Sequence, residues 1–139
     1  MINFNYETNF ALSNEDVVAA WIAESIKSEE HSLEEINYIF CDDNYLVEIN
    51  QQYLDHDTLT DIISFDYSVG NELQGDVFIS VERVVENAQD FDVTFEEELR
   101  RVLVHGILHY CGYKDKNEED ENLMRRKEEE KMKMFHVKQ

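Results

Sequence analysis

Strand-like patterns of hydrophobic and polar residues occur in four stretches of the chain. In these stretches apolar residues alternate with polar ones, or β-branched and aromatic residues cluster, and both patterns are typical of strands. Gly70 and Asn71 mark a turn before the last of them. The four predicted strands span residues 2–6, 33–42, 61–69 and 75–81.

Apolar residues at helical spacing predict five helices. The first has Ser13 as its expected N-cap, an apolar face that runs to Ile26, and an end near Lys27. Gly112 is a suitable stop for the fourth helix. The expected fold is α+β, a small mixed sheet of about four strands with about five helices around it and the fourth helix at its centre. The last four helices are predicted over residues 42–54, 81–89, 95–111 and 118–133.

Length and composition fit one domain in a reducing compartment. A chain of 139 residues with 42% hydrophobic content can bury a core without help from a metal. The first ten residues lack the basic and apolar regions of a signal peptide, and no apolar run approaches the roughly 20 residues of a membrane span. Cys41 and Cys111 are too few for a disulfide framework, so we expect a cytoplasmic protein that binds no membrane.

The net charge of −20 excludes a general nucleic-acid binder, which would show a basic face. The acid-rich segments are interpreted as solvated helix faces that keep the chain soluble. A nucleic-acid substrate would therefore be met by a local basic patch, by a metal ion or through a partner.

The stretch HGILHYCGYKD, residues 105–115, predicts a metal site. His105 and His109 are four residues apart, so on a helix they present two imidazoles from one face. Gly112 lets the chain turn back, and Asp115 then supplies a third ligand from another direction. Three protein ligands with an open position are the usual plan of a catalytic zinc site. Iron(II) is an alternative ion; the alternative without a metal places one histidine in the core and the other on the surface.

Gly106 stands where zinc peptidases usually carry a glutamate, the general base. Glycine inside a helix costs roughly 1 kcal/mol relative to alanine, so a reason for it is expected. One interpretation is close packing of another segment against the helix. The other is that the peptidase base is missing, and both can hold.

The stretch HGILHYCGYKD, residues 105–115, resembles the signature of the YbeY-type endoribonucleases, His-Gly-x-Leu-His-x-x-Gly-Tyr-x-His. The segments TDIISFDY (60–67) and GDVFISVERVVENA (75–88) are similar to two further blocks of that family. The resemblance extends from the first strand to the last helix, and it implies one metal-dependent hydrolase domain over residues 1–139. It also implies a single-strand-specific endoribonuclease with one zinc ion, or another divalent ion, that processes ribosomal RNA, notably at the 3′ end of the small-subunit rRNA. The expected partners are rRNA and ribosome or ribosome-assembly proteins, not DNA.

Three positions depart from the family pattern. Asp115 replaces the usual third histidine, which should still bind zinc but leave the metal less positive. Leu54 replaces an arginine that follows the tyrosine matching Tyr53. Asp66 replaces a proline. If the missing arginine holds RNA phosphate, its candidate substitutes nearby in sequence are His56, Lys114 and Lys116.

The remaining candidates have simple structural interpretations. Arg100 and Arg101 are expected to form ion pairs with Glu96–Glu98, and Cys111 to be a small core residue. His31 and His136 have no partner at metal spacing and are expected to face solvent. Three further residues either line a cleft or merely begin a strand: Thr60, Asp61 and Ser64. The resemblance implies that this strand borders the active site.

The site residues expected to be catalytic are His105, His109 and Asp115, acting through the metal, together with His56. A metallopeptidase is the rival enzyme, because the ligand plan is shared with that class. A non-enzymatic assembly factor with a structural metal is the rival from outside the enzymes. Loss of cleavage with retained folding after chelation favours the enzyme, and unfolding favours the structural metal.

Overall fold

The computed structural model describes residues 1–54 and 60–135, and in it four strands form one mixed sheet. The strand order is β1-β2-β4-β3, with β2 parallel to both β1 and β4, and β3 antiparallel to β4. This arrangement confirms the predicted α+β class. The strands are β1 (Ile2–Tyr6), β2 (Ser32–Cys41), β3 (Ile62–Asp66) and β4 (Glu72–Ser80).

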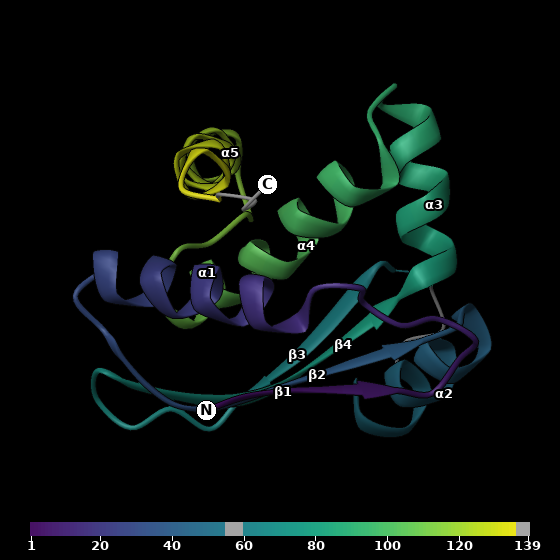
Figure 1. The fold of residues 1–139 in the computed structure, drawn as a ribbon, viewed down its shortest axis with the longest axis horizontal. Helices are drawn as coiled ribbons and strands as arrows, with labels where there is room; N and C mark the ends of the chain where they lie inside the picture. The colour runs from purple at the N-terminus through teal and green to yellow at the C-terminus, as the bar shows by residue number, and fades with distance from the viewer. Residues whose placement is uncertain (55–59, 136–139) are drawn as a thin grey trace.

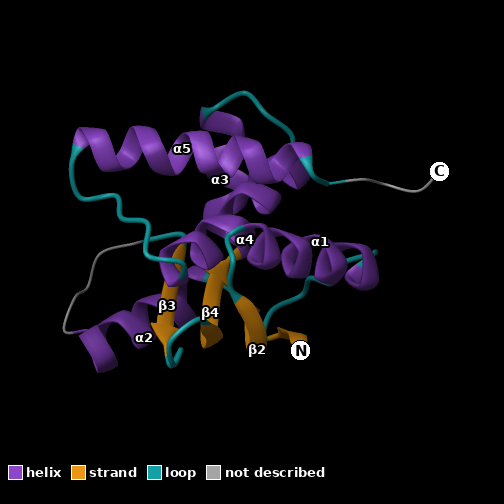
Figure 2. Ribbon diagram, turned by 90° about the vertical axis from the view of Figure 1, so that its left-hand side faces the viewer, coloured by secondary structure: helices purple, strands orange, loops and turns teal. Residues whose placement is uncertain are grey.

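Five helices surround the sheet in the described residues, as predicted. Helices α1 and α4 cover one face of the sheet, and α2 lies against the other face (Figure 1). Helix α5 packs on the side of α4 that faces away from the sheet (Figure 2). The helices are α1 (Glu15–Ser28), α2 (Asp43–Leu54), α3 (Val81–Asp90), α4 (Phe95–Tyr110) and α5 (Glu118–Lys133).

Three element boundaries differ clearly from the prediction. Strand β4 begins at Glu72, three residues before its predicted start at residue 75. Helix α1 has Asn14 rather than Ser13 as its N-cap. Strand β3 ends at Asp66, whose carboxylate accepts a hydrogen bond of 2.9 Å from the backbone N–H of Ser68. Such a side-chain bond to the backbone two residues on starts a turn and competes with strand pairing. The regular strand predicted to reach residue 69 is therefore interrupted after Asp66, and Val69 pairs with Glu72 again as an isolated bridge.

Helix α4 approaches the sheet closely because Gly106 has no side chain. A methyl group at this position would lie 3.2 Å from Cδ1 of Ile62 and 3.3 Å from Cγ1 of Val77, on β3 and β4. At the end of the same helix the Tyr110 hydroxyl donates a 3.0 Å hydrogen bond to the carbonyl of Phe65. The close-packing interpretation of Gly106 is confirmed, and this packing fixes the helix that carries both site histidines.

Candidate metal centre

Three donor atoms from the predicted ligands converge on one point. The Nε2 atoms of His105 and His109, both on α4, are 3.0 Å apart. Each lies 3.4 Å from Oδ2 of Asp115, which belongs to the loop after the helix. Ligands about 2.0–2.1 Å from a tetrahedral zinc ion are separated by about 3.3 Å. The donor types and their spacing therefore fit one zinc ion.

The loop that delivers Asp115 is shaped by Gly112 and tied down by Tyr113. Gly112 has a φ angle of +102°, in the left-handed region that favours glycine, and its N–H donates to the carbonyl of His109. The Tyr113 hydroxyl donates a 2.6 Å hydrogen bond to Glu29, just beyond the end of α1. The prediction that Gly112 stops the helix is confirmed, and the loop is held at a second point far away in sequence.

Hydrogen bonds at Nδ1 orient both imidazole rings. Nδ1 of His109 lies 3.0 Å from the carbonyl oxygen of Tyr113, and because that oxygen only accepts, Nδ1 carries the proton. Nδ1 of His105 lies 2.7 Å from Oε2 of the buried Glu128, on α5. Arg101 holds the other oxygen of Glu128 at 3.0 Å. Both Nε2 atoms are thus left free to bind a metal, in the arrangement by which protein groups commonly support metal-bound histidines.

The surroundings of His105 favour positive charge. Burial of the ring opposes its charged form, but the hydrogen bond to Glu128 and the nearby carboxylates outweigh burial and raise the pKa of His105. The same carboxylates attract any cation placed at Nε2. The electrostatics of the site therefore fit a bound metal ion as well as its geometry does.

Glu128→Gln is expected to weaken zinc binding by about 10- to 100-fold, the usual cost of losing a supporting partner of a metal-bound histidine. The change removes the carboxylate that orients His105 while keeping the size of the side chain. Competition with a chromogenic chelator measures the zinc affinity. Glu129→Gln, an equal charge change on the exposed face of α5, is the matched control. Equal affinities for the two variants would contradict this role of Glu128.

Two cavities, of about 280 and 350 Å³, open beside the candidate ligands. His105, Asp115, Arg125 and Glu128 line both of them. Asp61 lines the first cavity, where burial raises the pKa of its carboxyl above the ordinary value. Thr60 and Ser64, the other residues predicted to line a cleft or begin the strand, belong to neither lining. Strand β3 therefore borders the site through the residues at its beginning.

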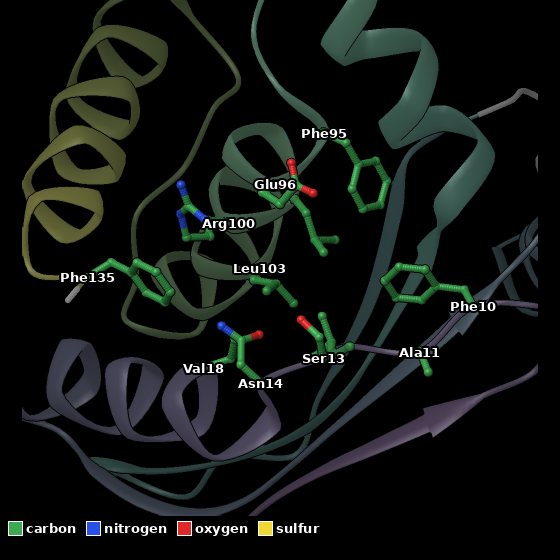
Figure 3. A pocket seen from close by; sticks show the side chains of 12 residues that line it. Phe10, Ala11, Ser13, Asn14, Val18, Phe95, Glu96, Arg100, Leu103 and Phe135 are labelled. Carbon is green, nitrogen blue, oxygen red and sulfur yellow. The ribbon is translucent and has the colours of Figure 1, made fainter. Parts of the chain in front are cut away.

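The arginines of α4 have different partners. Nε of Arg101 lies 3.7 Å from Glu98, as predicted, and the side chain also pairs with Glu128. Arg100 forms no ion pair with any described residue, contrary to expectation; its guanidinium lies 4.6 Å from the ring centre of Phe135 instead. Figure 3 shows the side chains of Arg100 and Phe135 at a separate cavity of about 160 Å³, which none of the predicted ligands lines.

The other predicted candidates lie away from the cavities or outside the described part of the chain. Lys114 and Lys116 are exposed on either side of Asp115 and line neither cavity. Cys111 is half-buried and packs against the core, as predicted. His31 is half-buried rather than fully solvent-facing, because Nδ1 bonds the carbonyl of Glu29. The predictions that fall outside the described residues concern His56, His136 and the side chain of Leu54.

Sequence reasoning missed Glu128 and Arg125, which it assigned to a solvated helix face. Glu128 is 5% exposed, and Arg125 lines both cavities. A signal was available, since Met124, Glu128 and Lys131 repeat at helical spacing on one face of the last helix. Acidic and basic residues on the apolar face of a helix are expected to have buried partners.

Fold and site together define an α+β protein with a candidate metal centre on a central helix and its following loop. The family model described as "Endoribonuclease YbeY" matches residues 2–136. The chain therefore belongs to the endoribonuclease YbeY family. No helix among the described residues is long and apolar enough to cross a membrane.

Curated relatives and a solved structure agree with this assignment. The chain is 68% identical to the endoribonuclease YbeY of Flavobacterium johnsoniae over 139 residues, with all of both chains covered. It is 66% identical to that of Flavobacterium psychrophilum, covering all of this chain and 99% of the relative. The solution structure of TM1509 from Thermotoga maritima is similar, with a TM-score of 0.73, 28% identity, and coverage of 97% of this chain and 89% of that one.

Proposed function

We propose that this chain is a zinc-dependent endoribonuclease that cuts single-stranded RNA during ribosome maturation, notably at the 3′ end of the small-subunit rRNA. Membership of the endoribonuclease YbeY family supports the cutting of RNA. The ribosomal substrate follows from the motif resemblance. The observation that carries the metal dependence is the convergence of His105, His109 and Asp115 on one point.

The residues of the chain would hold the metal, and they lack the usual base of a zinc peptidase. His105, His109 and Asp115 supply its ligands, and Glu128 and the Tyr113 carbonyl fix the two imidazoles. When bound, the metal supplies a Lewis acid that polarises a phosphoryl oxygen. Gly106 contributes no carboxylate. RNA needs no such base for its nucleophile, because its own 2′-hydroxyl lies beside the scissile phosphate.

The acidic surface makes docking partners part of this proposal. A net charge of −20 repels phosphate, so free RNA should bind weakly and without strong selectivity. Ribosomal or ribosome-assembly proteins that dock on the chain would then bring the substrate to the site. The same charge argues against a role on arbitrary DNA or RNA.

Chelation tests the proposed function. Purified protein is expected to contain one zinc ion per chain by elemental analysis and to cut single-stranded RNA; metal removal should abolish cutting while circular dichroism stays unchanged. The hydrophobic core on both faces of the sheet is formed without the ligands, so folding should persist. Unfolding after chelation would instead indicate a structural metal. Cleavage of a peptide library with no cutting of RNA would favour a metallopeptidase.

A further inference from the structure

We propose that Arg125, on α5, binds an RNA phosphate beside the candidate metal centre. This inference rests on the proposed function and names a substrate-binding residue for it. Arg125 lines both cavities that open at the site, and His105 and Asp115 line the same two cavities. A phosphate bound near the candidate ligands would therefore lie within the space that Arg125 borders.

The turn of α5 that carries Arg125 faces the site. Arg125 lies three residues before Glu128, whose carboxylate bonds His105, and directly after the buried Met124. Residues three apart on a helix lie on the same side, one turn from each other. Glu128 marks the side of α5 that faces His105, so Arg125 lies on that side, one turn closer to the beginning of the helix, and lines both cavities.

Arg125 is also available to a ligand. The other arginine of these cavities, Arg101, is already paired with Glu98 and Glu128. Arg125 is exposed and forms no ion pair or hydrogen bond with any described residue. Glu121, one turn earlier on α5, lines the larger cavity but makes no ion pair with Arg125. The charge of Arg125 also acts on the Glu98 carboxylate, but the guanidinium has no hydrogen bond or ion pair with a described residue to break when it binds phosphate.

The first cavity is lined by negative charge, so a phosphate bound there requires cations beside it. Four carboxylates line the first cavity, and they repel a phosphodiester. A metal ion at the three ligands would offset part of this charge, and an arginine beside it offsets more. The planar guanidinium can donate two hydrogen bonds to one phosphate, which gives orientation as well as attraction. The four carboxylates are those of Asp61, Glu98, Asp115 and Glu128.

The test compares Arg125→Gln with Arg126→Gln in the zinc-loaded full chain. Arg126 is exposed, carries the same charge and lines neither cavity, so it controls for the loss of one positive charge. Kinetics with a short single-stranded RNA give KM and kcat, and fluorescence anisotropy gives Kd at several salt concentrations. Arg125→Gln should raise KM and Kd by about tenfold, as expected for a lost charge-assisted hydrogen bond. The slope of log Kd against log salt should fall by about 0.7, one phosphate contact on a single strand.

The outcomes separate this inference from the proposed function. Arg126→Gln should stay within about twofold of the unmodified chain, and Arg125→Lys should recover part of the binding. Equal losses in Arg125→Gln and Arg126→Gln would show a general charge effect and overturn the inference. Loss of zinc or of folding in Arg125→Gln would overturn it too, because the role would then be structural. If the unmodified, zinc-loaded chain neither binds nor cuts RNA, the proposed function fails and this inference fails with it.

Discussion

His109→Ala is expected to lose its zinc and to cut RNA about 10³-fold more slowly or worse, with the fold intact. The variant removes one of three protein ligands and leaves an incomplete site. Such a loss corresponds to about 4 kcal/mol of transition-state stabilisation, within the contribution expected of a metal ion. The side chain of His109 is 31% exposed, so little packing is lost. Zinc content, RNA cleavage and circular dichroism together measure the effect.

Two further variants make this result specific to the site. His31→Ala removes a histidine that lines neither cavity of the site and should keep both zinc and cleavage. Asp115→His should also keep the metal, because imidazole is the third ligand implied by the motif resemblance. Metal loss in Asp115→His would show that the loop geometry is adapted to a carboxylate. Full zinc occupancy in His109→Ala would contradict the assignment of the ligands.

The secondary structure was predictable where local patterns decide it. Buried residues of β2 and β4 alternate, so the sequence pattern and the observed strands agree. The end of β3 was not predictable from hydrophobicity, since the polar turn bond between Asp66 and Ser68 decides it. The order of strands in the sheet also depends on contacts between distant segments, which no local pattern contains.

The candidate ligands were predictable because they lie close together in sequence. Helical spacing alone places His105 and His109 on one face, and the left-handed Gly112 accounts for the return of Asp115. The groups that orient those ligands could not be placed in the same way. Glu128 is 23 residues from His105, and its contact depends on how α5 packs on α4.

The last helix holds the site through charged residues on its buried side. Lys131 is 1% exposed and pairs with Glu29, the residue that also accepts a hydrogen bond from Tyr113. Burial alone would raise the pKa of Glu29, but the hydrogen bonds from Lys131 and Tyr113 outweigh it and lower that pKa. Helix α5 thus supports the ligand loop through Glu29 and the His105 ring through Glu128. Only the opposite side of α5 is the solvated, charged helix face that the composition suggested.

RNA with a single 2′-deoxynucleotide at the cleavage position is expected to resist cutting, by about 10³-fold or more. Internal attack forms a bond from the 2′-oxygen to phosphorus and breaks the bond to the 5′-oxygen, which leaves with a proton. The 2′-hydroxyl loses its proton in the same reaction. Position 106, where a peptidase carries its base, holds a glycine packed against Ile62 and Val77. The chain has no carboxylate there to activate water, so the nucleophile already present in the substrate is favoured.

Mass analysis of the ends completes this test. Internal attack leaves a 2′,3′-cyclic phosphate, or the phosphate formed when that ring opens, and a 5′-hydroxyl. The control RNA carries its 2′-deoxynucleotide two positions away and should be cut at the normal rate, which excludes an effect of the sugar on binding. Undiminished cutting at the modified position would show that water attacks the phosphorus. Asp61, a carboxylate that lines the first cavity and whose pKa is raised by burial, would then be the next group to test as the base.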